Sequence, residues 1–343
     1  MTTILAGDIG GTSARLACFE LIDGRLHRKI SKKYPSRTYQ GLEEIARVFI
    51  EEHRVAITHA AFGIAGPVQS GRVVMPNLPW VVEQAGLAHA LGIDAVWLIN
   101  DLEANAYGIA LLGPEDFVLL NAGIADARGN IAVISAGTGL GEAGAVWNGQ
   151  RLLPFACEGS HSDFAPRDER EAELLLHLRK RFGHVSWERV VSGPGLCNLY
   201  EFLRETGRGV EDPWVRGQMQ GDNPATVISR AALAGRCALC LRALDLFVSL
   251  YAAEAGNLAL KVMATGGVYL GGGIAPKIVE KLMAPGFMQS FSDKGRMRKL
   301  LEAMAVRVVL NDETALLGAA RFAAVRAGLP DPVAMSASNS ARA

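Results

Sequence analysis

The sequence predicts an α/β protein built from two domains of one architecture. Three expected strands, at residues 3–7, 15–21 and 26–34, are followed by alternating helices and strands, and the same plan begins again in the second half. Each set of strands encloses a glycine-rich turn, at residues 7–12 and again at 137–141. A plan that recurs along a chain indicates two domains with the same fold.

The remaining elements of the first half follow from spacing and turn residues. Asp23-Gly24 predicts a hairpin turn between the second and third strands. Apolar residues at three- and four-residue spacing predict a helix at 42–50. After it we expect, in order, strands at 56–65 and 73–75, a helix at 83–91, a strand at 95–99 and a helix at 102–112.

The second half continues with a strand at 151–155, helices at 168–182 and 194–205, longer helices over 224–263, strands at 268–270 and 306–310, and a helix at 314–327. We place the first domain at residues 1–112, completed by the helix 314–327, and the second at 113–313. The tail at 328–343 is rich in Pro, Ser, Ala and Asn and is expected to be disordered.

Composition excludes several classes of partner. The chain has 343 residues, half of them apolar, and 35 basic residues balance 35 acidic ones. No overall field favours nucleic acid or a membrane surface, so we predict neither as a partner. The N-terminus enters a strand without a basic segment and an apolar run, and the five scattered cysteines suit reduced thiols. We therefore expect no signal peptide and a cytoplasmic location.

Two short patterns have alternative interpretations. Cys237-Ala-Leu-Cys240 has the spacing of a zinc site, but no second pair and no nearby His accompany it, so buried helix cysteines are the better interpretation. Residues 139–144 match a dinucleotide-binding fingerprint, in which the glycines should open a helix. The residues that follow resemble strands, which argues against a dinucleotide enzyme.

Four further places along the chain suit ligand binding. Asn100 and Asp101 end an apolar strand, where α/β folds place their chemistry, although Asp101 could simply cap the next helix. Residues 158–164 carry two carboxylates, a histidine and two hydroxyls, a set that suits a sugar. Glu188 alone could be a solvated helix charge and His161 a structural residue. Residues 266–274 form a strand flanked by glycines, which could admit a purine or allow close packing.

Taken in this order, the motifs resemble the sugar kinase, actin and heat-shock ATPase superfamily, and within it the bacterial ATP-dependent glucokinases. Residues 7–12 and 136–141 resemble the two phosphate motifs, and 266–274 the adenosine motif. Residues 158–166, 188–195 and 293–296 are more specific to the family. The resemblance implies two ribonuclease H-like (actin-like ATPase) α/β domains with a cleft between them, and transfer of the γ-phosphoryl group of MgATP to the 6-hydroxyl of D-glucose.

The resemblance also implies a role for each motif residue. Asp101 is the expected catalytic base, and Asp8 is expected to hold Mg²⁺ through water. The expected glucose ligands are Asn77, Asn100, Asp101, Glu158, His161 and Glu188. The expected ATP-binding residues are Gly7, Asp8, Ile9, Gly10, Gly11, Thr12, Gly137, Thr138, Gly139, Gly266, Gly267, Gly272 and Gly273. A homodimer is expected, and no structural zinc.

Three rival functions stay open at this point. A kinase of the same fold could act on another hexose or an amino sugar, and Ser160, where the family usually has glycine, could alter selectivity. A sugar-sensing transcriptional regulator would need a basic DNA-binding segment, which the sequence lacks ahead of its first strand. A non-catalytic sugar-binding protein is opposed by Asp101 and both phosphate turns being intact.

Overall fold

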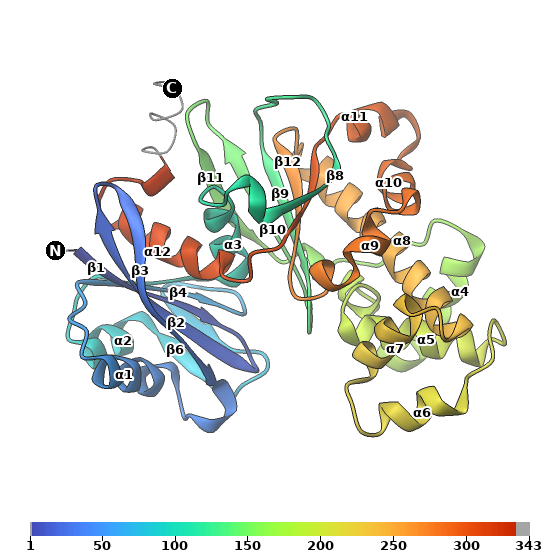
Figure 1. Ribbon diagram of the computed structural model, residues 1–343, viewed down its shortest axis with the longest axis horizontal. Coiled ribbons are helices and arrows are strands. Elements are labelled where there is room, and N and C mark those ends of the chain that lie inside the picture. Colours follow the sequence, from blue (N-terminus) through green and yellow to red (C-terminus); the bar gives the residue numbers. More distant parts are fainter. Residues whose placement is uncertain (1, 334–343) are drawn as a thin grey trace. The chain divides into compact units, whose positions relative to one another are not determined.

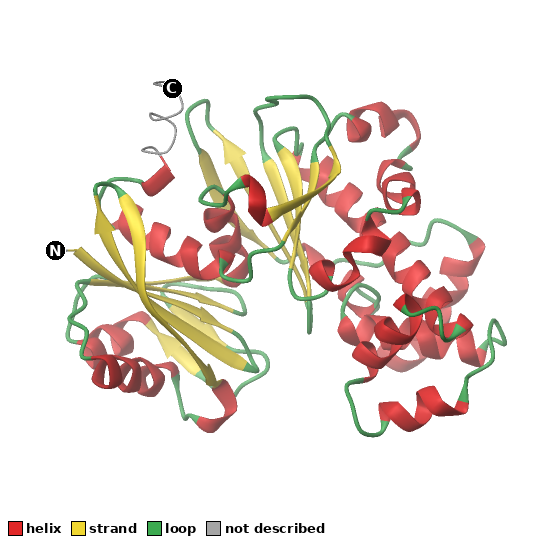
Figure 2. Cartoon of the chain, viewed as in Figure 1, coloured by secondary structure: helices red, strands yellow, loops and turns green. Residues whose placement is uncertain are grey.

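The computed structural model describes residues 2–333 and divides into two compact units. Figure 1 labels most of the helices and strands, and Figure 2 colours them by type. The first unit holds the chain up to Glu115, the short piece Leu153–Ala156 and the chain from Asn311 onward. The second unit holds Asp116–Leu152 and Cys157–Leu310. Each unit contains one large sheet with helices, as the sequence predicts for an α/β fold.

The first unit contains a five-stranded mixed sheet with the order β3-β2-β1-β4-β7. Its strands are β1 (Thr2–Ile9), β2 (Ser13–Ile22), β3 (Arg25–Pro35), β4 (His59–Ile64) and β7 (Val96–Asn100). The first three pair antiparallel, whereas β1, β4 and β7 run parallel. The predicted hairpin turn is confirmed, because Asp23 and Gly24 have the left-handed φ values of 49° and 72° that such a turn requires.

Helices pack on both faces of this sheet, because successive strand residues point to opposite sides. The helices of the unit are α1 (Leu42–His53), α2 (Gln84–Leu91), α3 (Asp101–Ile109) and α12 (Thr314–Arg326), with 3₁₀ turns η1 (Ser36–Thr38) and η2 (Pro114–Asp116). Leu5 packs in one cluster with α1 and α2, and its neighbours Ile4 and Ala6 pack in another with α12. A separate hairpin joins β5 (Arg72–Val74) and β6 (Val81–Glu83).

A six-stranded sheet has the order β11-β10-β9-β12-β13-β8, and all of its strands except β11 lie wholly in the second unit. Its strands are β8 (Phe117–Asn121), β9 (Ile131–Ala136), β10 (Leu140–Trp147), β11 (Leu152–Cys157), β12 (Gly267–Gly271) and β13 (Val306–Val309). As in the first unit, an antiparallel hairpin is extended by parallel strands, here β9, β12 and β13. β8 pairs antiparallel with β13 and was not predicted, since its apolar run shows no alternation.

The helices of the second unit build its largest apolar cluster around α8. They are α4 (Glu169–Phe182), α5 (Gly193–Glu205), α6 (Pro213–Met219), α7 (Pro224–Leu233), α8 (Ala238–Val262), α9 (Val279–Leu282), α10 (Pro285–Ser292) and α11 (Arg298–Glu302), with 3₁₀ turns η3 (Gly159–His161), η4 (Trp187–Arg189), η5 (Ala275–Ile278) and η6 (Gly295–Met297). Although α8 has 25 residues, no helix in residues 2–333 combines the length and apolarity needed to cross a membrane.

The segment predicted as longer helices over 224–263 is two helices, α7 and α8. Gly235 breaks it with a left-handed φ of 64°, and Cys237 caps α8 through a contact of 3.4 Å from the Cys240 amide to its Sγ. Both cysteines are buried, as expected of residues that pack a helix. The five cysteines of the chain form no disulfide.

The expected tail begins inside the described chain. Residues 328–333 follow α12, and the guanidinium of Arg321 forms an ion pair of 2.9 Å with Asp331. Arg321 is only 2% exposed and also donates to the carbonyl of Tyr107 on α3, so this part of the tail is tied to two helices. The rest of the expected tail, 334–343, lies outside the described residues.

Two glycines bring α3 and α12 into backbone contact. A Cβ at Gly318 would lie 1.7 Å from the carbonyl oxygen of Ala104, and one at Gly108 would lie 1.9 Å from that of Thr314. Any side chain at either position therefore overlaps the partner helix. The position of α3, which begins at Asp101, depends on this contact.

We expect Gly318→Ala to lower the free energy of unfolding by about 1–3 kcal/mol, because the added methyl group overpacks the contact. Urea unfolding followed by circular dichroism measures it. The control is Gly217→Ala on α6, where a Cβ meets no atom within 4 Å and a gain of about 0.5–1 kcal/mol is expected. An unchanged urea midpoint for Gly318→Ala would contradict the packing of these helices.

Candidate functional site

The first glycine turn connects β1 to β2 and is held by a serine from further along the chain. The Gly10 amide donates to the Ser13 carbonyl at 3.0 Å, which closes the turn. The Ser36 hydroxyl donates to the Gly10 carbonyl at 2.8 Å, and the Ser36 amide donates to the Thr12 carbonyl at 3.1 Å. Within the described chain the amides of Gly11 and Thr12 have no acceptor, so this turn can offer two consecutive N–H groups to an anion.

Two residues of the first motif serve packing. A Cβ at Gly7 would lie 2.4 Å from the ring of Phe62, so glycine is needed there to fit the core. Ile9 is fully buried in the cluster under α1 and α2. The structure therefore gives Gly7 and Ile9 supporting positions below the turn. Asn77, by contrast, lies against the turn, where a Cβ at Gly11 would come within 2.8 Å of its own Cβ.

Asp8 ends a row of charged side chains that crosses three strands. It pairs with Arg15 on β2, which in turn pairs with Lys33 on β3, so all three side chains share one face of the sheet. Burial raises the pKa of Asp8, and the positive charges of Arg15 and Lys33 oppose that rise. In residues 2–333 the Asp8 carboxylate accepts no hydrogen bond, so it is suited to a hydrated cation.

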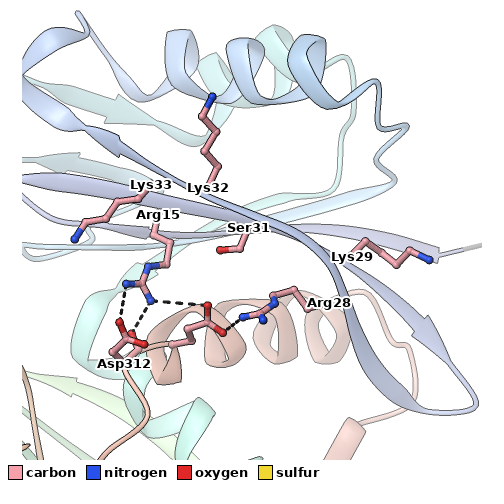
Figure 3. Close-up of a pocket in the computed structure, with 8 residues that line it drawn as sticks. Arg15, Arg28, Lys29, Ser31, Lys32, Lys33 and Asp312 are labelled. Atoms are coloured by element: carbon pink, nitrogen blue, oxygen red, sulfur yellow. Dashed lines mark hydrogen bonds and ion pairs between the residues drawn. The ribbon is translucent and has the colours of Figure 1, made fainter.

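Figure 3 shows Arg15 turned toward the residues that precede α12. Its guanidinium forms an ion pair of 2.8 Å with Asp312, beside a basic hollow of about 490 Å³. Arg15 and Lys33 are not among the site residues expected from the sequence. The signal that could have found them is register, because a short turn after Asp8 fixes which residue of the next strand lies opposite.

The end of β7 divides two roles between neighbouring residues. The side-chain oxygen of Asn100 caps α3 by accepting from the amides of Leu102 at 2.9 Å and Glu103 at 3.3 Å. Its amide group donates to the Gly66 carbonyl at 3.2 Å. The expectation that Asp101 could be the helix cap is therefore wrong, since Asn100 takes that role and Asp101 is the first helical residue.

Glycine also brings Asp101 close to Asp8. Gly63 on β4 pairs with Asp8, and a Cβ at Gly63 would lie 2.8 Å from the Cβ of Ala104 and 3.6 Å from the Cα of Asp101. The start of α3 thus lies against the strand next to β1. The first unit brings Asp8, the turn at 10–12 and Asp101 together at the carboxyl ends of its parallel strands.

The second glycine turn connects β9 to β10 in a similar way. The Gly137 amide donates to the Gly139 carbonyl at 2.8 Å, and the Gly137 carbonyl accepts from the Gly193 amide at 2.8 Å, at the start of α5. Among the residues that the structure describes, the amides of Thr138 and Gly139 have no acceptor. This turn also offers two consecutive N–H groups.

Glu188 holds this turn from η4. Its Oε2 accepts from the Leu140 amide at 3.1 Å, and a Cβ at Gly139 would lie 2.5 Å from the same oxygen. The interpretation of Glu188 as a solvated helix charge is therefore wrong. The dinucleotide interpretation also fails here, because residues 140–147 form β10, where that fingerprint requires a helix.

The glycines around β12 separate into two groups. Gly272 has a left-handed φ of 80°, and a Cβ there would lie 2.4 Å from the carbonyl oxygen of Ala136, so Gly272 and Gly273 adjoin the second turn. Gly266 donates to the Asn130 carbonyl at 2.9 Å and Gly267 pairs at the start of β9, at the opposite end of the strand. The structure does not bring Gly266 and Gly267 to the turn, which corrects their expected place in the ATP site.

Glu158 and His161 lie at the two ends of η3. Their side chains are half-exposed, with 3.8 Å between Oε2 and Nε2. The Trp187 amide donates to the Ser162 carbonyl at 3.2 Å, which ties this segment to η4 and Glu188. Ser160 is 1% exposed, so any effect of this residue on selectivity is indirect.

Metal-binding side chains do not cluster in the part of the chain that the structure describes, where no group of three or more His, Cys, Asp or Glu residues could hold an ion.

Comparison with known proteins gives a consistent result. A family model described as Glucokinase matches residues 5–326. The glucokinase of Synechocystis sp. is 42% identical over 345 residues, which cover 93% of this chain and 97% of the relative. The glucokinase of Nostoc sp. is 40% identical over 341 residues, which cover 94% of this chain and 99% of the relative.

Solved structures agree with the sequence comparison. The crystal structure of glucokinase from an Antarctic psychrotroph is 32% identical, has a TM-score of 0.81 and covers 95% of this chain and 99% of its own. A glucokinase of the ROK family from Streptomyces griseus, in complex with glucose and AMPPNP, has a TM-score of 0.64 over 93% of this chain and 98% of its own. At 20% identity, this second likeness shows the fold alone.

We expect Glu188→Ala to speed hydrogen exchange of the Leu140 amide by about tenfold to a hundredfold, because a hydrogen bond to a charged group contributes about 1.5–3 kcal/mol. Glu188→Gln keeps an oxygen acceptor and should retain most of the protection. Exchange at single-residue resolution, by NMR or mass spectrometry, distinguishes the two. Equal exchange in wild type and Glu188→Ala would show that Glu188 does not hold the turn.

Proposed function

Because the chain belongs to the glucokinase family, whose members phosphorylate glucose with ATP, we propose that its own residues transfer the γ-phosphoryl group of MgATP to the 6-hydroxyl of D-glucose, giving glucose 6-phosphate and ADP. The proposal depends mainly on the position of Asp101 near the first glycine turn. A carboxylate at the first residue of α3 lies beside Asp8 and a turn with two unused N–H groups.

Asp101 is the proposed general base. Phosphoryl transfer needs an oriented nucleophile and charge neutralisation, with little covalent work by the protein. The carboxylate of Asp101 would accept the proton of the 6-hydroxyl as that oxygen attacks the γ-phosphorus. Asn100 supports this role, because it caps α3 and so fixes the direction in which the first helical residue leaves the backbone.

We assign sugar binding to two groups of residues. Asn77, Asn100 and Asp101 come from the first unit. Glu158, His161 and Glu188 come from the second, where η3 and η4 are tied together. Carboxylates accept from vicinal hydroxyls and a neutral imidazole can donate or accept, so the set can satisfy several hydroxyl groups. The half-exposed side chains of Glu158 and His161 support their availability to a ligand.

We assign phosphate binding to the unused amides of Gly11, Thr12, Thr138 and Gly139. Gly272 and Gly273 adjoin the second turn and would receive the adenosine. Asp8 would hold Mg²⁺ through water, since its carboxylate is unpartnered and partly buried. When bound, that ion neutralises the charge that builds on the transferring phosphate oxygens. Arg15 and Lys33 add positive charge on the same face of the sheet.

We further propose that the enzyme is cytoplasmic and acts as a homodimer. The free thiols suit a reducing compartment, and the dimer rests on the family resemblance. Sedimentation velocity at micromolar concentration tests the dimer.

The activity itself is tested by coupled ADP release with MgATP against glucose, mannose, fructose, galactose, glucosamine and N-acetylglucosamine. We expect glucose to have the highest kcat/KM. A higher kcat/KM for another sugar would change the assigned substrate. No turnover with any of them would leave a sugar-binding protein as the better interpretation.

We expect Asp101→Asn to lower kcat by about 10²–10⁴-fold while the glucose Kd changes little, because the amide keeps the shape but cannot take a proton. The matched control is Glu103→Gln, in the same turn of α3, which should keep nearly full kcat. Steady-state kinetics and equilibrium dialysis measure the two quantities. A variant with more than about a tenth of the wild-type kcat would rule out Asp101 as the base.

We expect Glu158→Gln to raise the glucose KM by about tenfold or more, because it replaces a charged hydrogen-bond acceptor with a neutral one. The ATP KM should change little. Glu169→Gln removes an exposed carboxylate at the start of α4 and serves as the control. A variant in which only the ATP KM rises would show that Glu158 belongs to the nucleotide site.

A further inference from the structure

Glu142 is a buried carboxylate that the proposed mechanism does not use. It lies on β10, is 1% exposed, and within the described chain no N–H or O–H group donates to either of its oxygens. A Cβ at Gly159 would lie 2.2 Å from its Oε2, so the carboxylate lies directly against the backbone of η3. An unpaired buried charge is costly, so this group must be neutral or share a proton.

Gly159 is held from two sides. Its amide donates to the Sγ of Cys157 at 3.1 Å, while the carboxyl group of Glu142 lies where a side chain would be. Glu158 precedes Gly159 directly, and His161 is two residues further on. Any displacement of the Glu142 carboxyl group would therefore move the backbone between both proposed sugar ligands.

Glu254 is the acidic neighbour of Glu142 in the protein interior. It lies on α8 and is fully buried. Burial, and then the proximity of Glu254, raise the pKa of Glu142 to about 8, while Lys261 opposes the rise. Burial raises the pKa of Glu254 as well. Two adjacent buried carboxylates cannot both ionise readily, so at neutral pH the pair retains a proton.

The polar contacts continue from Glu254 to the segment at 293–296, one of the three segments more specific to the family. Asn257 donates to Glu254 at 2.8 Å, and the ammonium of Lys294 donates to the side-chain oxygen of Asn257 at 2.7 Å. A Cβ at Gly256 would lie 2.4 Å from the carbonyl oxygen of Phe291, so glycine lets this segment approach α8. A continuous row of polar side chains thus connects Lys294 to Gly159.

We propose that Glu142 and Glu254 share one proton and that this pair, with a single negative charge, positions the backbone between Glu158 and His161. The sugar-binding part of the proposal rests on the proposed function. Glu142 is a positioning residue, because it acts through Gly159 and not by touching the sugar. Lys294 and Asn257 orient Glu254, which gives the family-specific segment at 293–296 a role.

The proposal has a definite pH dependence. Below pH 8 the pair is protonated, and above it the shared proton is lost and two negative charges face each other. The ionisable groups around Glu142 are Glu254 and Lys261 on α8 and Cys157 and Glu158 beside η3, and those around Glu254 include Lys294. The net result is repulsion under Gly159 on the alkaline side, and therefore weaker sugar binding there.

Glu142→Gln tests the pair, because an amide stays neutral at every pH and can still donate to Glu254. One unit above a pKa of about 8, only about a tenth of the wild-type pairs keep the proton. We expect the wild-type glucose KM to rise up to about tenfold between pH 7 and pH 9 and the variant's to stay nearly constant. The ATP KM should change equally in both. Parallel glucose KM curves would overturn the proposal.

Two further variants separate charge from shape. Glu142→Leu is neutral but cannot hydrogen-bond to Glu254, so we expect a raised glucose KM without the alkaline rise. Glu169→Gln leaves the pair intact and should reproduce the wild-type pH profile. A wild-type-like KM in Glu142→Leu at every pH would show that the pair does not position the sugar ligands.

Thermal unfolding tests the shared proton without any sugar. The unfolded chain loses the Glu142 proton near its ordinary pKa of 4.5, whereas the folded chain keeps it to about pH 8, so wild-type stability falls as pH rises across that interval. We expect the Tm of Glu142→Gln minus the Tm of the wild type to increase from pH 5.5 to pH 8.5. A constant difference would overturn the shared proton even in an active glucokinase. A growing difference in a protein without sugar phosphorylation would support the pair and reject the proposed function.

Discussion

Backbone contact at positions without a Cβ is the constraint on which the candidate site depends. In the first unit Gly63 lets α3 lie against β4, and Gly318 fixes α3 against α12. In the second unit Gly272 lets the turn after β12 reach Ala136 at the end of β9. The start of α3 and the turn after β12 are therefore each placed by a close approach that one methyl group would prevent.

The sequence predicted the repeated plan of strands and the position of both turns, because these depend on local patterns. Periodicity does not give the register between strands, so it does not predict the row of charged side chains from Asp8 through Arg15 to Lys33. The Asp8–Arg15 pair could be predicted only from the short turn that joins β1 to β2. The separation of Gly266 from Gly272 was missed for a different reason. Residues 266–274 form one motif in the sequence, but β12 lies within it. The five residues of this strand put Gly266 and Gly272 at opposite ends of the sheet.

The helix cap at the end of β7 and the strand β8 also differ from the sequence predictions, for two separate reasons. Both Asn100 and Asp101 can cap a helix, and only the dihedral angles at the end of β7 decide which residue is outside the helix. β8 was not predicted because its half-buried apolar run has no alternation to distinguish strand from loop, and its pairing with β13 depends on residues almost two hundred positions away.

Asp8 is a partly buried carboxylate and Glu142 a fully buried one, and their charged neighbours differ. Asp8 shares a sheet face with two cations, but Arg15 is held by Asp312 at 2.8 Å, so the Asp8 carboxylate itself remains available. Glu142 meets another carboxylate, and a proton is the simplest way to remove the repulsion. The first environment leaves a carboxylate that can accept from a hydrated cation, and the second suits two carboxyl groups that share one proton and a single negative charge.

In each of the two glycine turns, some backbone N–H groups stabilise the turn and others are left without an acceptor. The Gly10 amide closes the first turn on Ser13, and the Gly137 amide closes the second on Gly139. In each case the amides of the next two residues have no acceptor in the described chain, so one N–H is used for shape and two are left for an anion. The same separation applies to side chains, since Asn100 and Glu188 each use an oxygen on the backbone. Membership in a motif therefore does not identify a ligand; a residue contacts substrate only with the groups that its own fold leaves unused.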